Sequence, residues 1–279
     1  MKKTVVDPMK TSIEILKESV KSLKNQPISS AISKIIHEEE VKLLAETIKY
    51  ERFFFVVDII NQEIIHAHGI KQWLGYDDHK FSFGFYSNLI HPNYIEATFL
   101  LAKSTLALVN SNSFEQGFMK EKFVIQIALR HAQGHYILVK RTLSSWDYDP
   151  TTKVSIAYLN EFTILEEYDE TDKSNTLKPR ITDIYGTRLV NIENILRESS
   201  YKTLESSKRF SVQELRILRK YAYNPTITSN EVANTFKIKP NTIDTYNRRI
   251  ITKFNYIYPN EKVKSAKEIA QFLRKECFI

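Results

Sequence analysis

Asparagine, arginine and hydroxyl side chains gather in residues 239–253, near the end of the chain. An Asn side chain can bond the edge of adenine and an Arg side chain the edge of guanine, whereas Lys and hydroxyl groups can hold phosphates. By this chemistry, the candidates to reach base edges are Asn241, Thr245 and Arg248. The candidates to hold phosphates are Lys239, Thr242, Arg249 and Lys253. The segment therefore predicts an interface with double-stranded DNA.

These side chains share one face only if the segment is a helix. Pro240 suits the first helical position, where its missing N–H would have no partner anyway. Apolar residues then recur at helical spacing: Ile243, Tyr246, Ile250 and Phe254. The opposite face carries Asn241, Asp244, Thr245, Asn247, Arg248 and Thr252, with Arg249 and Lys253 at its margins.

Further helices surround this one. Three sequences match the capping box, in which a hydroxyl accepts from the third helical N–H and a Glu reaches back to the cap: Ser211-x-x-Glu214, Thr228-x-x-Glu231 and Ser265-x-x-Glu268. The turn before Pro240 is only Lys237-Ile238-Lys239. We therefore expect four short helices, the second and third of which form a helix-turn-helix.

At these residues the chain resembles the LuxR/GerE-type helix-turn-helix, over about 210–275. The matching stretches are Ser211-Val-Gln-Glu214 with Ile217-Leu218, Ser229-Asn-Glu-Val-Ala233, Phe236-Lys-Ile-Lys-Pro-Asn-Thr242-Ile243 and Ile250-x-x-Lys253-Phe254. The resemblance implies a DNA-binding transcription regulator, and in that family the last helix often mediates dimerisation.

The chain departs from the family pattern at several positions. Tyr223-Asn224-Pro225 replaces a loop glycine, and Asp244 and Tyr246 replace the usual Lys and His. About five extra residues, around 256–262, precede the last helix. A carboxylate such as Asp244 faces DNA awkwardly unless it accepts from a cytosine amine. These changes leave the target sequence and the dimer geometry open. They also keep one alternative in view: a protein–protein adaptor that has lost DNA binding.

The charge is uneven along the 279 residues. Residues 201–279 hold 16 Lys and Arg against 7 Asp and Glu, a net charge of +9. Residues 1–200 hold 24 against 26, a net charge of −2. Such asymmetry indicates one part that meets a polyanion, although a basic solvated surface would give the same numbers.

The N-terminal part has a different pattern. Strands are predicted at 53–60, 63–68, 123–130, 136–144 and 154–165, with irregular helices over 70–110. This order is not the βαβ alternation of a parallel sheet. We therefore expect one five-stranded antiparallel sheet with helices on one face. The expected fold class is an α+β N-terminal domain followed by an all-α, four-helix C-terminal domain.

Two short motifs lie between the second and third predicted strands: Trp73-Leu-Gly-Tyr76 and Leu89-Ile-His91-Pro92-Asn-Tyr94. With the order of the strands, they make residues 50–168 resemble the PAS sensor fold. Other α+β domains remain alternatives, such as a GAF-like fold or the pheromone-binding domain of LuxR relatives. A PAS fold implies a ligand between sheet and helices, with candidate contacts at Phe55, Ile65, Trp73, Phe85, Tyr94, Ile125 and Val139.

Several chemistries find no support in the residues. The one cysteine, Cys277, excludes an intrachain disulfide and a multi-cysteine metal site, and it lies outside the domain where flavin-adduct chemistry would need it. Haem would need an axial ligand such as His66, His68, His79 or His91, and each is better explained as a surface or structural histidine. We therefore expect no enzyme, no metal and no identified cofactor.

These observations define four segments: N-terminal helices at 1–50, a PAS-like sensor at 51–168, a linker with an amphipathic helix at 169–208, and the helix-turn-helix domain at 209–279. The helices predicted at 9–24 and 181–198 are candidates to pair protomers. The expected protein is a cytoplasmic transcription regulator that binds double-stranded DNA as a homodimer. RNA polymerase is a further candidate partner, and no membrane contact is expected.

Overall fold

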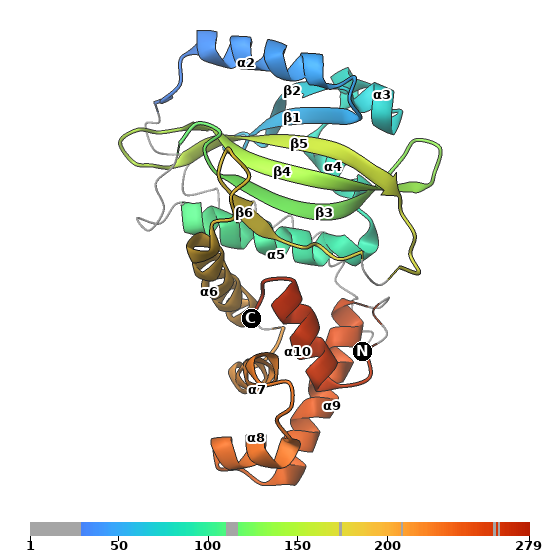
Figure 1. Cartoon of the computed structure of the whole chain (residues 1–279), viewed down its shortest axis with the longest axis vertical. Helices are drawn as coiled ribbons and strands as arrows, with labels where there is room; N and C mark the ends of the chain where they lie inside the picture. Colours follow the sequence, from blue (N-terminus) through green and yellow to red (C-terminus); the bar gives the residue numbers. More distant parts are fainter. Residues whose placement is uncertain (1–28, 110–116, 173–174, 208, 259–260, 262) are drawn as a thin grey trace, which may run out of the picture. The chain divides into compact units, whose positions relative to one another are not determined.

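A computed structural model describes residues 29–109, 117–172, 175–207, 209–258, 261 and 263–279. The chain divides into two compact units, one that contains a β-sheet and one built of helices (Figure 1). The boundary lies between Glu193 and Asn194. The helix predicted at 9–24 lies outside the described residues. No helix among the described residues is long and apolar enough to span a bilayer.

A six-stranded antiparallel sheet forms the centre of the N-terminal unit, in the order β2-β1-β5-β4-β3-β6. The strands are β1 (Arg52–Asp58), β2 (Glu63–His68), β3 (Lys122–Arg130), β4 (Tyr136–Tyr148), β5 (Ser155–Glu167) and β6 (Arg180–Thr182). The five predicted strands are confirmed, as is the α+β class. The sixth strand was not predicted, because three residues carry too little alternation to be recognised.

The helix predicted at 181–198 is wrong in its first part, where the chain forms β6 and a turn instead. Ile181 pairs with Phe123 of β3, and a turn then leads to α6 (Val190–Ser206). Gly186 takes a left-handed φ of 82° in that turn. Because residues 183–189 lie outside the helix, Ile184 and Tyr185 are exposed instead of joining its apolar stripe.

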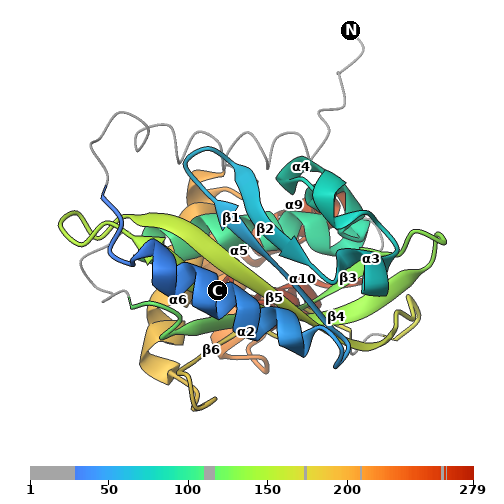
Figure 2. The same cartoon turned by 90° about the horizontal axis from the view of Figure 1, so that it is seen from above.

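Helices cover both faces of the sheet, not one face as predicted. After α3 (Ile70–Leu74) and the 3₁₀ turn η1 (Asp78–Lys80), α4 (Phe83–Leu89) and α5 (Pro92–Val109) pack on the inner face. On the outer face α2 (Lys34–Thr47) lies across the sheet (Figure 2). Its Leu44 packs against Phe54 and Trp146. Residues 53–57 of β1 are all buried, since alternate side chains enter opposite cores. This run of five apolar residues was an available signal for a strand covered on both faces.

Aromatic rings fill the inner core. Phe55 is fully buried, and its ring contacts those of Tyr86, Phe81 and Phe162. Phe53 stacks on Phe162 with the ring centroids 4.5 Å apart. Such pairs bury large apolar areas in defined geometries, and here they hold α4 and the end of η1 against β1 and β5.

The C-terminal unit contains the last part of α6 and four further helices: α7 (Val212–Tyr223), α8 (Ser229–Phe236), α9 (Pro240–Ile257) and α10 (Ala266–Lys275). These helices confirm the all-α prediction. Complete capping boxes begin α7 at Ser211 and α8 at Thr228. Before α10, Ser265 accepts from the N–H of Glu268, but the Glu268 carboxylate accepts from the N–H of Lys264. The third capping box is therefore shifted by one residue on its Glu side.

Gly69 connects β2 to α3 and provides a test of this packing. Its φ is +81°, and a Cβ placed there would lie 3.0 Å from the Arg52 carbonyl oxygen and 3.1 Å from Phe53 Cβ. We expect Gly69→Ala to destabilise the N-terminal unit by about 2 kcal/mol or more, because strain and clash add. Gly134→Ala is the control, since its φ is +98° but nothing lies within 4 Å. Its cost should be about 1 kcal/mol.

Urea unfolding followed by tryptophan fluorescence measures this difference, because Trp73 and Trp146 both lie in the N-terminal unit. Equal losses of stability in the two variants would show that the contacts around Gly69 do not constrain the junction.

Candidate functional site

The helix-turn-helix consists of α8, the turn 237–239 and α9. Lys237 ends α8 in a left-handed conformation, with φ 53° and ψ 43°. The N–H of Ile238 then donates to the carbonyl of Ala233 across 3.0 Å. Pro240 occupies the start of α9, as predicted. This compact turn fixes the point where α9 begins.

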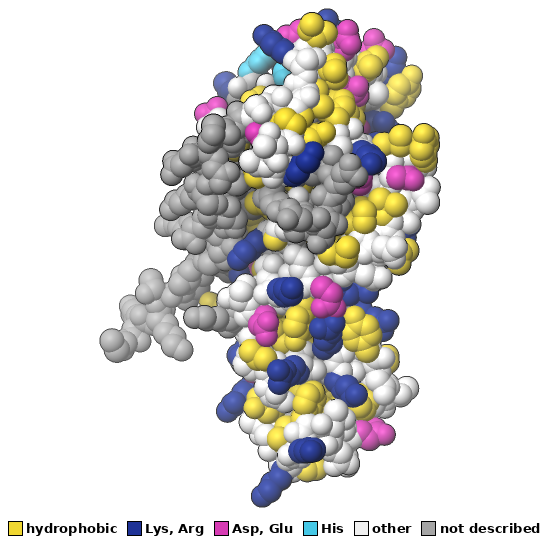
Figure 3. Space-filling view, turned by 90° about the vertical axis from the view of Figure 1, so that its left-hand side faces the viewer, with side chains coloured by type: hydrophobic (Ala, Val, Ile, Leu, Met, Phe, Trp, Pro, Cys, Tyr) yellow, Lys and Arg dark blue, Asp and Glu magenta, His cyan; other side chains and the backbone are white. Residues whose placement is uncertain are grey.

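The apolar face of α9 is buried and its polar face is exposed. Ile243, Ile250 and Phe254 are fully buried. The exposed residues Asn241, Thr245, Arg248 and Thr252 follow the spacing i, i+4, i+7, i+11, which places them along one side of a helix. The three residues predicted to reach base edges therefore lie on one line, called here the reading line. Lys and Arg side chains are also spread over the face of this unit that Figure 3 shows.

The two threonine hydroxyl groups along the reading line donate hydrogen bonds to the backbone of α9. Thr245 Oγ1 donates to the carbonyl of Asn241 across 3.0 Å, and Thr252 Oγ1 donates to that of Arg248 across 3.0 Å. In this state Thr245 offers a base only its acceptor lone pairs and its methyl group. Arg248 is exposed, and its guanidinium has no ion-pair partner among the described residues.

The predicted phosphate contacts divide into two groups. Lys239, Thr242 and Arg249 are exposed, on α9 or directly before it. Lys253 instead forms an ion pair with Glu214 of α7, with Nζ 2.6 Å from Oε2. Glu214 is only 2% exposed, and its carboxylate also accepts from the N–H of Ser211. Lys253 thus holds α9 against α7, and its role as a phosphate ligand stays a prediction.

Asn247 also differs from the expectation that it lies on the outer face. It is half-buried, and its Nδ2 donates to the hydroxyl of Tyr221 across 3.3 Å. That hydroxyl lies 3.4 Å from Ser229 Oγ at the start of α8. Tyr221 therefore connects three helices. The sequence signal for this role is weak, since one tyrosine on the apolar stripe of α7 resembles any core aromatic residue.

The N-terminal unit contains a pocket between the sheet and α5. Its volume is about 80 Å³, and apolar side chains make up most of its lining, among them Val57, Leu106 and Leu143. Arg141 and Asn160 also line it. Both Nε and Nη2 of Arg141 donate to Asn160 Oδ1, across 3.0 and 2.6 Å.

Arg141 is a buried cation, only 9% exposed, with no carboxylate partner among the described residues. Its guanidinium lies 5.7 Å from the ring centre of Tyr86. The Tyr86 hydroxyl is buried without a hydrogen-bond partner among the described residues, as is the hydroxyl of Thr105, which lines the pocket. Burial raises the pKa of Tyr86, although the charge of Arg141 opposes this, so the phenol stays protonated and remains a donor.

The seven predicted pocket residues do not line this cavity. Phe55, Ile125 and Val139 are buried in the core of the sheet, Phe85 is half-buried on α4, and Ile65 is 48% exposed on β2. Residue type alone therefore does not locate the cavity.

Trp73 and Tyr94, the other two predicted contacts, bond to the backbone. Trp73 donates its Nε1–H to the carbonyl of Ile48 across 2.6 Å. Tyr94 donates its hydroxyl to the carbonyl of Asn175 across 2.9 Å. Both side chains thus anchor neighbouring segments.

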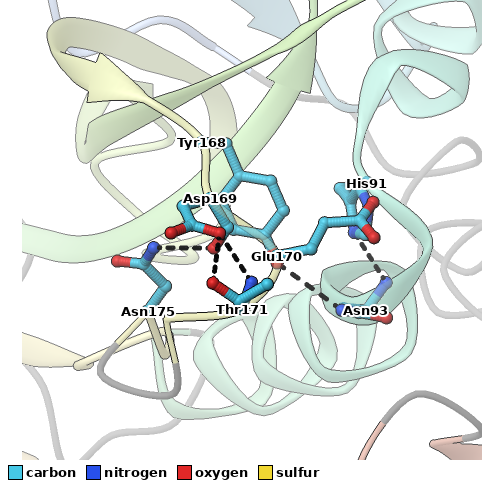
Figure 4. A network of polar contacts seen from close by, with 7 residues as sticks. All are labelled: His91, Asn93, Tyr168, Asp169, Glu170, Thr171 and Asn175. Carbon is cyan, nitrogen blue, oxygen red and sulfur yellow. Dashed lines mark hydrogen bonds and ion pairs between the residues drawn. The ribbon is translucent and has the colours of Figure 1, made fainter.

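Both motifs that suggested a PAS fold form turns. Gly75 ends α3 with φ 79°, and a Cβ there would lie 2.8 Å from that of Ala132. His91 is buried, and both of its ring nitrogens have partners (Figure 4). Nδ1 accepts from the N–H of Asn93 at 3.3 Å, and Nε2 contacts Glu170 Oε1 at 2.9 Å. His91 therefore ties the start of α5 to the segment after β5, and haem ligation would break these contacts.

The other candidate haem ligands are dispersed. His66 and His68 lie on β2, and His79 lies in η1. Among the described residues, no group of three His, Cys, Asp or Glu side chains is placed to hold a metal ion.

Comparisons with known proteins found no matching family model and no matching curated protein. The chain is similar to several solved structures. A PAS domain from Colwellia psychrerythraea is 17% identical, with 46% of this chain and 98% of that one covered and a TM-score of 0.34. A phage VqmA–DPO complex is 14% identical, with 87% and 92% covered and a TM-score of 0.28. The Vibrio cholerae VqmA dimer is 13% identical, with 86% and 88% covered and a TM-score of 0.30.

The ion pair between Lys253 and Glu214 gives a test of how α9 is held. We expect Lys253→Met to destabilise the C-terminal unit by about 3 kcal/mol, because it leaves the buried Glu214 carboxylate without its cation. Arg249→Met is the matched control on the same helix, since Arg249 is exposed. That change should alter stability by no more than about 0.5 kcal/mol.

Hydrogen exchange of the α9 amides in the full-length protein reports on this unit separately from the other. Equal protection of α9 in both variants would show that Lys253 contributes no more than a surface charge.

Proposed function

We propose that this protein is a transcription regulator that binds double-stranded DNA through α9. The observation that carries the proposal is the exposed reading line of Asn241, Thr245 and Arg248, on a helix whose opposite face is buried. A helix presented in this way fits the major groove, where Asn and Arg can recognise bases. The net charge of +9 in residues 201–279 supplies the attraction to phosphates.

The proposed assembly is a homodimer. One helix-turn-helix reads only a few base pairs, and two copies related by a two-fold axis read two half-sites at a fixed spacing. The alternative of a protein adaptor rests on Asp244, which is exposed beside the reading line and would repel phosphates. Steep salt dependence favours DNA binding, whereas an adaptor would show a defined protein partner and little affinity for DNA.

Arg248 gives the direct test of DNA reading. The full-length protein is incubated with fragments of its source genome at near-physiological salt, and the retained DNA is sequenced. We expect the wild type to retain a shared two-fold motif. Arg248→Ala should lower the preference for that motif by roughly 10- to 100-fold, because a bidentate Arg–guanine contact contributes about 1–3 kcal/mol of discrimination.

Arg216→Ala is the charge-matched control, since Arg216 is exposed on α7, outside the turn and α9. It should leave the preference unchanged. If Arg248→Ala binds the selected site as well as the wild type does, Arg248 does not read bases. If the wild type retains no DNA, the adaptor function replaces this proposal.

The second part of the proposal is that the N-terminal unit senses a small molecule in the pocket beside Arg141. Arg141, Tyr86 and Thr105 supply hydrogen-bond donors in or beside a largely apolar site, so the ligand should present acceptors. A buried guanidinium without a carboxylate is costly. A carboxylate on the ligand would supply the missing charge, and the volume of about 80 Å³ restricts it to a short molecule.

Short acids provide the probe for this pocket. We expect propionate or butyrate to raise the melting temperature of the full-length protein, through mass action on the folded state. Butyramide, similar in shape but uncharged, should have a smaller effect. The rise in melting temperature with acid should vanish in Arg141→Met. It should persist in the control Arg130→Met, because Arg130 is exposed at the end of β3. Equal responses to acid and amide would contradict a charged contact at Arg141.

A further inference from the structure

The outer face of the sheet divides into an apolar part and a charged part. Leu44 of α2 covers the apolar part, which includes Phe54, Val56 and Leu159. Beyond it, the strand register aligns polar side chains in two neighbouring rows, and cross-strand partners share a face of the sheet. One row contains Arg52, Thr163 and Lys140, and the next contains Glu161, Thr142, Val124 and Arg180.

Four cations and one carboxylate meet on this charged part: Arg52, Lys122, Lys140, Arg180 and Glu161. Glu161 balances little of the charge, since its ion pair with Lys122 is long, with Nζ 4.0 Å from Oε2. Partial burial lowers the pKa of the Lys140 ammonium, and the charges of Arg52 and Arg180 lower it further, while the charge of Glu161 opposes them only in part. The cations therefore repel one another, and a bound anion would relieve that repulsion.

The same side chains line a groove of about 510 Å³. The volume lies within the usual range for small-molecule sites. One wall is the turn after β6, where the Asp183 carboxylate accepts from the N–H groups of Tyr185 and Thr187. Arg188 on the same wall is paired with Glu193. The two charged side chains of the wall thus have partners nearby. The four cations of the floor share one carboxylate, that of Glu161.

Tyr185 adds an aromatic surface at the rim. It lines the groove and is 86% exposed. A ring this exposed contributes little to the core, but it offers a face on which a planar ring can stack. Thr142 and Thr163 add hydroxyl side chains to the lining of the same groove. Cations, hydroxyl groups and an aromatic ring therefore lie within one concave site.

We propose that this groove binds a nucleoside polyphosphate. Its phosphates lie against Lys140, Arg180 and Arg52, and its base stacks on Tyr185. The four cations and one carboxylate of the floor give a net charge of +3, which suits two or three phosphates better than a single carboxylate. The groove is concave and walled by the turn, so it suits a small molecule and not a duplex. This site is separate from the reading line of α9 and from the pocket beside Arg141.

Isothermal titration of the full-length protein tests the proposal with ATP, tripolyphosphate and adenosine, at fixed ionic strength and without DNA. We expect saturable 1:1 binding of ATP and much weaker binding of adenosine.

Lys140→Met and Arg180→Met should each lower the affinity for ATP about tenfold, the loss expected for one charge-assisted hydrogen bond. Lys42→Met is the charge-matched control, because Lys42 is exposed on α2 and does not line the groove. Far-UV circular dichroism and melting temperature establish that each variant is folded.

Tyr185→Ala separates the two halves of the site. It should lower the affinity for ATP about fivefold or more, in line with base–aromatic stacking, and leave the affinity for tripolyphosphate unchanged. Binding of ATP should also raise the pKa of Lys140, measured by NMR of its side chain. Arg248→Ala should bind ATP as the wild type does, because DNA reading and this groove use different residues.

Three results would overturn the proposal. One is the lack of saturable ATP binding by the wild type. Another is an equal loss in Lys42→Met and Lys140→Met, which would indicate general charge attraction. The third is a pair of results: tripolyphosphate binds as tightly as ATP, and Tyr185→Ala does not change the binding of ATP. Together they would show that the base makes no contact with the site.

Discussion

The geometry of the C-terminal unit depends on one buried carboxylate. Glu214 closes the first turn of α7 by accepting from the N–H of Ser211, and the same oxygen pairs with Lys253 of α9. A carboxylate this buried is tolerated because both interactions compensate for its lost hydration. Since Lys253 and the reading line belong to one helix, this contact helps to set the direction in which Asn241 and Arg248 point. The apolar stripe buries α9, but the ion pair restricts its rotation and sliding.

The two proposed binding sites of the N-terminal unit share a strand. Lys140 and Arg141 are neighbours in β4, and the pleat of a strand sends successive side chains to opposite faces. Arg141 therefore enters the core under α5, while Lys140 lines the groove on the outer face. Each cation lacks full compensation within the described residues, for different reasons. Arg141 bonds only a neutral amide, and Lys140 is surrounded mainly by like charges.

Much of the fold follows from local sequence, and the sites do not. Ser211, Thr228 and the alternating strands are short-range signals, so the helix starts and the five long strands could be predicted. Strand β6 depends instead on the free edge of β3, which is a property of the folded sheet. The partner of Lys253 lies 39 residues away, and no spacing rule connects the two. In the sequence Arg141 looks like a surface residue, and only the strand register places it opposite Phe162 on the inner face. Its charge lacks a partner only because the side chain is buried there, away from water.

The left-handed turn at Lys237 has a consequence for how this protein can diverge. A residue with φ near 53° tolerates glycine or asparagine at little cost, accepts unbranched side chains with some strain, and excludes β-branched ones. The backbone therefore limits this position to a few residue types, whatever α9 binds. The exposed Arg248 carries no such restriction from the fold. Descendants of this chain can thus change the exposed residues of the reading line while the turn before it stays nearly constant.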